Sequence, residues 1–279
     1  MDAIWTILDV LNWTTNYFKS KKIPNSRFDA ESIISHCLRI KRLELYLKFD
    51  QPLEKSERNL IKDLVKRRGK REPLQYLLGE VEFYNCKFEV NPSVLIPRHE
   101  TEYMVEMILN DKSSPKSILD LCTGSGAIAI SLKKEIKNVL VTASDISMDA
   151  LKTAENNAIK NDVKVKFIQS DLFGNIADKF DLIVSNPPYV DKTIYENLEP
   201  EIFFEPKIAL IASEKGLGIY KSILDDAHNY LNKRGVLFFE IGDEQAFEIK
   251  NYAELKGFKN IKVIEDLSGK DRIMRMEND

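Results

Sequence analysis

The sequence of 279 residues predicts an α/β domain built on a mostly parallel sheet, preceded by a small helical bundle. From about residue 115 onward, strand-like and helical segments alternate, as in a parallel sheet covered by helices on both faces. Residues 1–75 instead show apolar residues at helical spacing and almost no glycine. Between these regions the stretch VEFYNCKFEV alternates in polarity, which predicts a β-hairpin. We therefore expect a helical bundle at 1–75, a linker hairpin at 76–95 and an α/β domain at 96–279.

The helices of the bundle follow from the spacing of their apolar residues. The first and last of them carry Ile4, Ile7, Leu8 and Leu11, and Leu60, Ile61, Leu64 and Val65. Between them, Ser26 is expected to begin a helix, with Asp29 three residues later in the manner of a capping box. Ile33, Ile34 and Cys37 would share one face of that helix.

The α/β region is predicted segment by segment. The expected strands are SILDLCT, NVLVTASD, VKVKFIQSD, FDLIVSN, GVLFFEIG, KNIKVIED and DRIMRME, and the expected helices are GAIAISLKKEI, SMDALKTAENNAIKN and a segment around residues 218–231. Sheets of this kind bind ligands at the carboxyl ends of their strands. The search for a site therefore concentrates on the residues that follow each strand.

Composition narrows the class of protein and its partners. The chain is 43% hydrophobic and 30% charged, with no basic signal peptide and no run of apolar residues long enough to span a membrane. Its three cysteines are far apart, which predicts a reducing cytoplasm and neither disulfides nor a metal site. We expect a cytoplasmic monomer with no membrane partner.

Charge is unevenly distributed along the chain. Residues 1–95 hold 17 Lys and Arg against 13 Asp and Glu, whereas the remainder holds 24 against 31. The basic excess is concentrated in the run KRRGKR at 66–71. This run is either the solvated end of a helix or a contact for an anionic partner such as RNA or an RNA-bound protein. A protein that reads DNA usually has a broader basic surface, so no stable nucleic-acid partner is expected.

The loop after the first strand has the features of a nucleoside-binding site. Gly124 and Gly126 allow a tight turn and a close approach of the backbone to a ligand, at the start of a helix. Asp145 follows the second strand, where its carboxylate can accept hydrogen bonds from both ribose hydroxyls.

Two cofactors are compatible with this half of the sequence. The spacing of Gly124, Gly126 and Ala129 matches the dinucleotide fingerprint of NAD enzymes. S-adenosylmethionine is favoured, because Asp120 lies where it could hold the methionine end of that cofactor. Asp171, after the third strand, could accept from an adenine amino group, with Leu172 packed against the ring; alone, Asp171 is as well explained as a turn cap.

The stretch Asn186-Pro187-Pro188-Tyr189 ends a buried strand with unusual chemistry. The prolines fix the backbone, which sets the direction of their carbonyls. The Asn186 side-chain oxygen and the Pro187 carbonyl can accept the two hydrogens of a substrate amino group. Tyr189 offers an apolar face to a planar amide or base.

This arrangement suits methyl transfer to nitrogen. A planar amino group has a delocalised lone pair and is a poor nucleophile. Two fixed acceptors orient it, and orientation contributes up to about 7–11 kcal/mol in favourable reactions. The methylated nitrogen is acidic enough to lose its proton to water, so the chemistry does not require any of His36, His99 or His228 as a base.

These motifs resemble those of the bacterial peptide chain release factor glutamine methyltransferases. The stretches that carry the resemblance are Leu95 to Glu102, Asp120 to Ile130, Asn186 to Tyr189, Glu205 to Leu210, Glu240 to Gly242 and Gly269 to Ile273, together with the helical N-terminal region. The resemblance covers nearly the whole chain. It implies the Rossmann-like, seven-stranded and mostly parallel sheet of class I S-adenosylmethionine-dependent methyltransferases.

The resemblance also implies a substrate and a set of site residues. The substrate would be the glutamine side-chain amide in the Gly-Gly-Gln motif of class I release factors, methylated at N5, with the N-terminal bundle docking on the release factor. Asn186 and Pro187 would grip the amide, and Pro188 and Tyr189 would shape its slot. The cofactor would be bound by Asp120, Cys122, Thr123, Gly124, Ser125, Gly126, Asp145, Asp171, Leu172 and Asn186.

This sequence departs from the family pattern at two positions. Cys122 replaces the first glycine of the cofactor loop, and we interpret it as a packing residue and not a nucleophile. His99 stands where the family has proline, and it is expected to cap a helix over Glu100 to Leu109. Arg98 and Glu100 either order the substrate pocket or form a salt bridge within the linker.

Three other functions remain open on the sequence alone. A DNA or RNA adenine N6-methyltransferase would use the same Asn-Pro-Pro-Tyr chemistry, although the acidic balance of the α/β half disfavours it. An NAD-dependent oxidoreductase leaves Asn186 to Tyr189 without a role. A non-catalytic nucleoside-binding scaffold leaves the chemistry of that loop unused.

Overall fold

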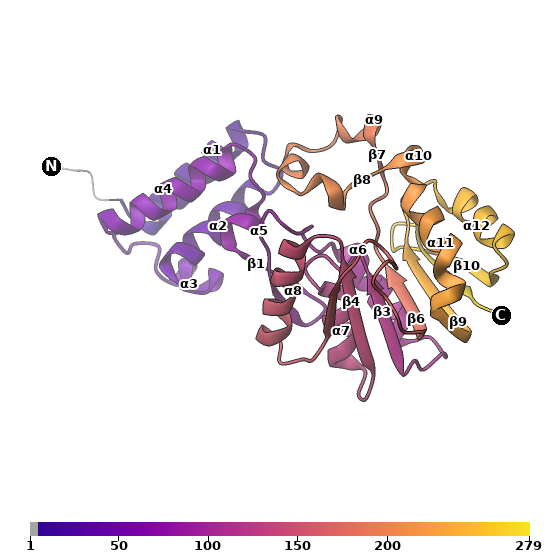
Figure 1. The fold of residues 1–279 in the computed structure, drawn as a ribbon. Helices are drawn as coiled ribbons and strands as arrows, with labels where there is room; N and C mark the ends of the chain where they lie inside the picture. Colours follow the sequence, from indigo (N-terminus) through magenta and orange to yellow (C-terminus); the bar gives the residue numbers. More distant parts are fainter. Residues whose placement is uncertain (1–4) are drawn as a thin grey trace. The chain divides into compact units, whose positions relative to one another are not determined.

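The computed structural model describes residues 5–279, so Ile4 lies outside the described residues. The described chain forms two compact units (Figure 1). One unit holds the residues up to Gly79 together with Glu199–Phe204, and the other holds Glu80–Leu198 and Glu205–Asp279. The short segment Glu199–Phe204 therefore belongs with the N-terminal unit although it is far away in sequence.

The N-terminal unit is helical. Its elements are α1 (Ile7–Ser20), α2 (Ser26–Leu38), α3 (Arg42–Leu47), α4 (Lys55–Gly69), α5 (Leu74–Leu78) and the 3-10 helix η1 (Pro200–Phe204). Most of the apolar positions expected from the sequence belong to its core, where Ile7, Leu11 and Ile61 are buried. Leu60 is an exception, because it is exposed on α4. The expected capping box at Ser26 is wrong, because Asn25 is the N-cap and Ser26 Oγ donates to the Ile23 carbonyl.

The basic run at 66–71 is in part the solvated end of α4, because Lys66, Arg67 and Lys70 are exposed, but its three arginines are paired with carboxylates. Arg68 is buried at the end of α4, where its Nε lies 2.7 Å from Asp29 Oδ2 and its Nη1 lies 2.8 Å from Glu201 Oε1. Arg71 Nη2 lies 2.7 Å from Glu201 Oε2. Arg67 pairs with Glu72 instead. The arginines of the run therefore hold the N-terminal unit together and fasten Glu199–Phe204 to it.

The second unit begins with the β-hairpin expected from the sequence. Strands β1 (Glu80–Phe83) and β2 (Cys86–Glu89) pair antiparallel. The two residues between them, Tyr84 and Asn85, both have positive φ, as a tight two-residue hairpin turn requires. The hairpin packs with the second unit, where Phe83 and Phe88 enter its core.

A seven-stranded sheet forms the centre of this unit, in the order β10-β11-β9-β6-β3-β4-β5. Its strands are β3 (Ser117–Leu121), β4 (Leu140–Asp145), β5 (Lys166–Gln169), β6 (Phe180–Ser185), β9 (Leu231–Glu240), β10 (Lys259–Glu265) and β11 (Asp271–Glu277). Pairing is parallel from β5 to β9, whereas β11 runs antiparallel to both of its neighbours. The predicted mostly parallel sheet is confirmed.

Helices cover both faces of the sheet (Figure 1). One face packs against α6 (His99–Leu109), α7 (Ala127–Glu135) and α8 (Met148–Lys160), and the other against α11 (Gly218–Tyr230) and α12 (Ala246–Leu255). Successive residues of a strand point to opposite faces of the sheet. In β9, Phe238 packs in the core that includes α6, α7 and α8, and Phe239 packs in the core that includes α11 and α12. The remaining short elements are β7 (Val190–Asp191), α9 (Lys192–Tyr195), η2 (Lys207–Ala209), β8 (Ile211–Ala212) and α10 (Ser213–Gly216).

Within residues 5–279, no helix combines the length and apolarity needed to cross a membrane.

Candidate active site

The ends of three neighbouring strands define the site. Leu121 of β3 is opposite both Ser144 of β4 and Ser185 of β6. Cys122, Asp145 and Asn186, each one residue further along, therefore emerge at the same edge of the sheet. The chain also changes direction here, since β4 and β5 extend the sheet on one side of β3 while β6 and β9 extend it on the other. Ligands of α/β sheets bind at such a switch point.

A pocket at this edge brings together residues from the cofactor loop, from the ends of β4 and β5 and from the Asn-Pro-Pro-Tyr stretch. The predicted site residues that line it are Cys122, Gly124, Asp145, Asp171, Leu172, Asn186 and Pro188. Asp120, Thr123, Ser125, Gly126, Pro187 and Tyr189 are not among its lining residues. The pocket also includes residues to which the sequence gave no role, among them Val94, Pro206 and Ile219.

Asp145 is held by the backbone of the loops around it. Its Oδ2 accepts from the Gly124 N–H at 2.9 Å, and its Oδ1 accepts from the Ser147 N–H at 2.9 Å. Burial raises the pKa of this carboxyl despite these bonds. Because each carboxylate oxygen has two lone pairs, both oxygens retain capacity to accept a hydroxyl from a ligand in the pocket.

Asp120 is fully buried below the cofactor loop. Its Oδ2 accepts from Thr123 Oγ1 at 2.6 Å and from the Ala129 N–H at 3.2 Å, which ties the loop to the start of α7. Its Oδ1 has no partner among the described residues. Burial raises the pKa of Asp120 to about 7, and the charge of Asp145 adds to the shift. Asp120 therefore shapes the loop directly and leaves one acceptor atom unused.

Two glycines of the loop serve different purposes. Gly124 has φ of +56° and lines the pocket, and no atom lies within 4 Å of where a Cβ would be. Gly126 has φ of +81°, and a Cβ there would lie 3.1 Å from the Ala154 Cβ. Gly126 therefore permits the close packing of α7 against α8, and its contribution to ligand binding is indirect.

Cys122 occupies a backbone conformation that favours glycine. Its φ is +60°, in the left-handed region. Burial raises the pKa of the thiol to about 12, and the charge of Asp145 contributes to the shift. A thiol that stays protonated is a poor nucleophile, which agrees with the interpretation as a packing residue.

Replacing Cys122 by glycine is expected to stabilise the protein. Strain at a non-glycine residue in this region costs about 1–3 kcal/mol, and the greater freedom of glycine in the unfolded chain offsets about 0.5–1 kcal/mol of that. We expect Cys122→Gly to raise the free energy of unfolding by about 1 kcal/mol, measured by urea denaturation. Cys122→Ala keeps the backbone strain and is the matched control. Equal stabilities of the two variants would show that the strain is absent.

Asp171 and Leu172 lie on the same side of the pocket as Asp145. Asp171 is exposed, and its carbonyl accepts from the Gly174 N–H at 2.9 Å in a turn. The carboxylate has no hydrogen bond or ion pair to the described residues, so the alternative of a turn cap gains no support from its side chain. Leu172 is half-buried and lines the pocket.

Asn186 presents its amide in one defined direction. Its Nδ2 donates to Thr101 Oγ1 at 3.3 Å, and Thr101 Oγ1 in turn donates to Glu240 Oε2 at 2.6 Å. Asn186 Oδ1 and the Pro187 carbonyl accept no hydrogen bond from the residues that the structure describes. Two neighbouring acceptors are thus available to a ligand.

The segment that follows β9 stabilises the loop Asn186 to Tyr189 through a hydrogen bond from Gln245. Gln245 Nε2 donates to the Tyr189 carbonyl at 3.1 Å, while Gln245 Oε1 accepts from the Gly242 N–H at 3.1 Å. A Cβ on Gly216 would lie 2.2 Å from the Tyr189 carbonyl oxygen, so only glycine fits there. Burial raises the pKa of Tyr189 to about 12, with a further contribution from the charge of Glu240.

Sequence reasoning missed Gln245 and assigned no role to Thr101 or Glu240. Thr101 and Glu240 lie in stretches that carry the family resemblance, and Gln245 comes three residues after one. That placement was the signal available in the sequence. Their hydrogen bonds join residues that are 56 to 139 positions apart in the sequence, and a local sequence pattern does not reveal such contacts.

The linker region before α6 is ordered by an ion pair. Arg98 Nη2 pairs with Glu205 Oε1, and Glu205 Oε2 accepts from the Ile96 N–H at 3.0 Å. Arg98 thus forms a salt bridge, but with the distant segment that begins at Glu205. The expected cap at His99 is wrong, because Arg98 is the N-cap and His99 is the first residue of α6. The His99 side chain is 91% exposed and lies 3.2 Å from Glu102.

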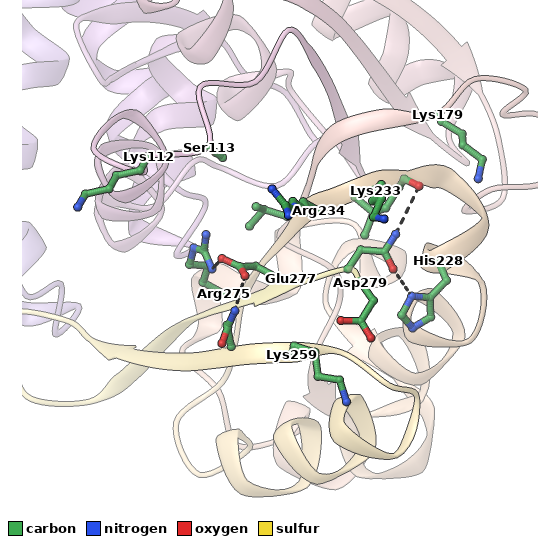
Figure 2. A pocket seen from close by; sticks show the side chains of 14 residues that line it. Lys112, Ser113, Lys179, His228, Lys233, Arg234, Lys259, Arg275, Glu277 and Asp279 are labelled. Carbon is green, nitrogen blue, oxygen red and sulfur yellow. Dashed lines mark hydrogen bonds and ion pairs between the residues drawn. The ribbon is translucent and has the colours of Figure 1, made fainter.

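A larger hollow lies away from the motifs, at the opposite ends of the parallel strands (Figure 2). Its lining includes five lysines and arginines with no ion pair to the described residues: Lys112, Lys179, Lys233, Arg234 and Lys259. His228, labelled in Figure 2, also lies there, and its Nδ1 is within hydrogen-bond distance of Asn278 Oδ1. The size of a hollow therefore does not locate the chemistry in this protein.

Comparison with known proteins decides the family. Over 273 residues the chain is 40% identical to the release factor glutamine methyltransferase of Geobacter sulfurreducens, covering 97% of this chain and 96% of that protein. The chain belongs to the release factor glutamine methyltransferase family. A second relative of this family, from Rhodopirellula baltica, is 39% identical over 289 residues, covering 99% of this chain and 97% of that protein. The resemblance seen in the sequence motifs is confirmed.

Domain models and solved structures agree with membership of the release factor glutamine methyltransferase family. Residues 9–79 match the PrmC N-terminal domain, and residues 99–212 match the methyltransferase small domain. A methyltransferase from Pyrococcus furiosus has a similar fold, with a TM-score of 0.54 at 19% identity, covering 68% of this chain and 87% of that one. The predicted methyltransferase fold is thereby confirmed.

Proposed function

We propose that this protein methylates the N5 atom of a glutamine side chain in class I peptide chain release factors, with S-adenosylmethionine as the methyl donor. One observation carries the proposal most directly: Asn186 Oδ1 and the Pro187 carbonyl are neighbouring acceptors without a partner among the described residues, beside the pocket that Gly124, Asp145 and Asp171 line. A primary amide has two N–H donors, which these two acceptors match. Full-length similarity to release factor glutamine methyltransferases supports the substrate.

The residues that line the pocket, and the buried residues behind its cofactor loop, fit S-adenosylmethionine. Asp120 Oδ1, buried and without a partner, is a suitable acceptor for the methionine end, directly or through water. Asp145 has spare lone pairs for ribose hydroxyls, and Asp171 is exposed beside Leu172 for an adenine base. Thr123 and Ser125 are buried and support the loop from Cys122 to Gly126.

The residues around the slot explain how a glutamine amide nitrogen, which is a poor nucleophile, can accept a methyl group. Bound S-adenosylmethionine supplies an electrophilic methyl group. Asn186 and Pro187 hold the two substrate N–H groups, so that the nitrogen lone pair points at that carbon. Both acceptors also stabilise the positive charge that develops on the nitrogen as its bond to carbon forms. The surplus proton then passes to water, while Pro188 and Tyr189 bound the slot for the amide.

The remaining parts of the proposal concern location and partners. The N-terminal unit docks on the release factor, and the protein acts as a cytoplasmic monomer with no stable nucleic-acid partner. The N-terminal unit's match to the PrmC N-terminal domain and its separate compactness support a distinct docking role.

A labelling experiment tests the activity. Methyl-labelled S-adenosylmethionine is supplied with a release factor, with the same factor carrying Gln→Ala in its Gly-Gly-Gln motif, or with DNA. Label on the first substrate alone is the expected result. Label on DNA would identify an adenine methyltransferase instead. If the protein does not bind S-adenosylmethionine, an NAD-dependent oxidoreductase or a non-catalytic nucleoside-binding scaffold would be favoured instead.

The ribose role of Asp145 has its own test. We expect Asp145→Ala to weaken S-adenosylmethionine binding by about 10- to 100-fold, because hydrogen bonds to a charged group contribute about 1.5–3 kcal/mol. Isothermal titration calorimetry measures the dissociation constant. Asp178→Ala removes an exposed aspartate of the same unit and is the control. An unchanged dissociation constant would remove Asp145 from the cofactor site.

A further inference from the structure

We propose that Thr101 and Glu240 are positioning residues that fix which end of the Asn186 amide faces the substrate. The inference rests on the proposed function and deepens it, because it explains how the acceptor oxygen of Asn186 comes to be available. The Thr101–Glu240 pair joins the first turn of α6 to the end of β9, behind the loop that holds Asn186.

The three side chains form a directed series of hydrogen bonds. Glu240 accepts from Thr101 Oγ1 at 2.6 Å, and Thr101 Oγ1 accepts from Asn186 Nδ2 at 3.3 Å. Thr101 is 4% exposed and Glu240 is 2% exposed, so water does not substitute for either contact. The end of the series is Asn186 Oδ1, the atom assigned to the substrate amide.

The direction of the series follows from the donors that each group possesses. An ionised carboxylate can only accept, so Glu240 claims the single hydroxyl hydrogen of Thr101. The Thr101 oxygen is then left as an acceptor, and only the NH₂ end of an amide can donate to it. If Asn186 were turned by 180°, its oxygen would face the oxygen of Thr101 without a hydrogen between them. Glu240 therefore sets the orientation of Asn186, both through Thr101 and by its own attraction for the NH₂ group of Asn186.

Burying the Glu240 carboxylate costs folding free energy. It has no ion pair within residues 5–279, and burial raises its pKa to about 7. Hydrogen bonds from the side chains of Thr101 and Asn186 lower this pKa, as does the charge of Arg272 of β11, whereas the charge of Glu100 of α6 raises it. Tyr189 and Tyr220 are also close, and the Tyr220 hydroxyl donates to the Glu240 carbonyl at 2.8 Å. A leucine or glutamine would pack there without this cost, but neither has the property of an ionised carboxylate, which can only accept hydrogen bonds.

Matched variants test the inference at pH 8, where the Glu240 carboxyl is mostly ionised. Thr101→Val removes the hydroxyl but keeps the shape, whereas Thr101→Ser keeps the hydroxyl. We expect Thr101→Val to lower kcat for release-factor methylation by about 10- to 100-fold, the range for a misplaced catalytic group. KM for the release factor and the Kd for S-adenosylmethionine should change less than about twofold. Thr101→Ser should recover most of kcat.

Glu240→Gln provides the second variant, because an amide can donate to Thr101 and so permits the reversed orientation. It should lower kcat while binding S-adenosylmethionine normally, which also shows that the variant is folded. A wild-type kcat in both Thr101→Val and Glu240→Gln would overturn the inference. A loss in Thr101→Val that Thr101→Ser does not recover would also overturn it, by pointing to packing instead of the hydroxyl.

A measurement without substrate separates this inference from the proposed function. The side-chain ¹⁵N–¹H₂ resonances of Asn186 should shift in Thr101→Val and stay near their wild-type positions in Thr101→Ser. If the Asn186 resonances do not shift in Thr101→Val, the positioning role of Thr101 and Glu240 is overturned, even if the enzyme methylates release factors. A wild-type protein that leaves release factors unlabelled, but whose Asn186 resonances respond as expected, would overturn the proposed substrate and leave the positioning pair supported.

Discussion

Asn186→Ala is expected to lower kcat for release-factor methylation by about 10²–10³-fold. The substitution removes one of the two acceptors assigned to the substrate amide, and loss of one group that stabilises developing charge has typically this effect. The Pro187 carbonyl remains, so some activity should persist. Single-turnover kinetics with labelled S-adenosylmethionine measure the chemical step directly.

Two comparisons make the Asn186 result interpretable. Asn251→Ala removes an exposed asparagine of α12 and should leave kcat unchanged. The Kd for S-adenosylmethionine should stay within a few fold of the wild-type value in both variants, because most of the pocket lining is unaltered. A kcat for Asn186→Ala close to that of Asn251→Ala would contradict the role of Asn186 as an amide acceptor.

Arg68→Ala is expected to lower the free energy of unfolding of the N-terminal unit by about 3–5 kcal/mol. Removing one partner of a buried ion pair leaves the other charge uncompensated, which is the costly case. Burial already raises the pKa of Asp29, and Arg68 is the group that opposes this shift. Without Arg68, Asp29 would remain buried with no ion pair, and Glu201 would retain only Arg71.

Tryptophan fluorescence during urea denaturation measures this effect selectively. The chain has two tryptophans, Trp5 and Trp13, and both lie in the N-terminal unit. Arg67→Ala is the neighbouring control, because the Arg67 side chain is 44% exposed and its pair with Glu72 should contribute less than about 1 kcal/mol. Similar losses in the two variants would mean that Arg68 stabilises the unit no more than a surface charge does.

Regular elements and strand-end loops were predictable because their signals are local. The spacing of apolar residues predicts α1, α2 and α4 of the bundle but not the short helices α3 and α5, and alternation with turn residues predicts the hairpin around Tyr84 and Asn85. A parallel sheet aligns the carboxyl ends of its strands, so the positions of Asp145 and Asn186 just after two strands predict that they lie at the same edge of the sheet. The roles proposed for these residues remain predictions until they are tested.

What could not be predicted depends on contacts between distant parts of the chain. The partner of Arg68 at Glu201 lies 133 residues away, and Thr101 and Glu240 are 139 residues apart. The predicted start of α2 at Ser26 is confirmed, but the capping roles expected of Ser26 and His99 belong to the preceding residues, Asn25 and Arg98. Caps depend on backbone geometry that neighbouring positions satisfy equally well. At Cys122, composition gave no indication of the positive φ, and only the glycine of the family pattern pointed to it.

The segment Glu199–Phe204 limits how the N-terminal unit can be exchanged between relatives. In a chimera with a single junction at Gly79, the helices would come from a relative, whereas the segment Glu199–Phe204 would still come from this protein. The helices of the relative would then need two arginines placed like Arg68 and Arg71 to pair with Glu199 and Glu201. A functional graft must therefore transplant both pieces of chain together. The same linkage makes substitutions at Arg68 and at Glu201 mutually dependent during divergence, although the two residues are encoded by well-separated parts of the gene.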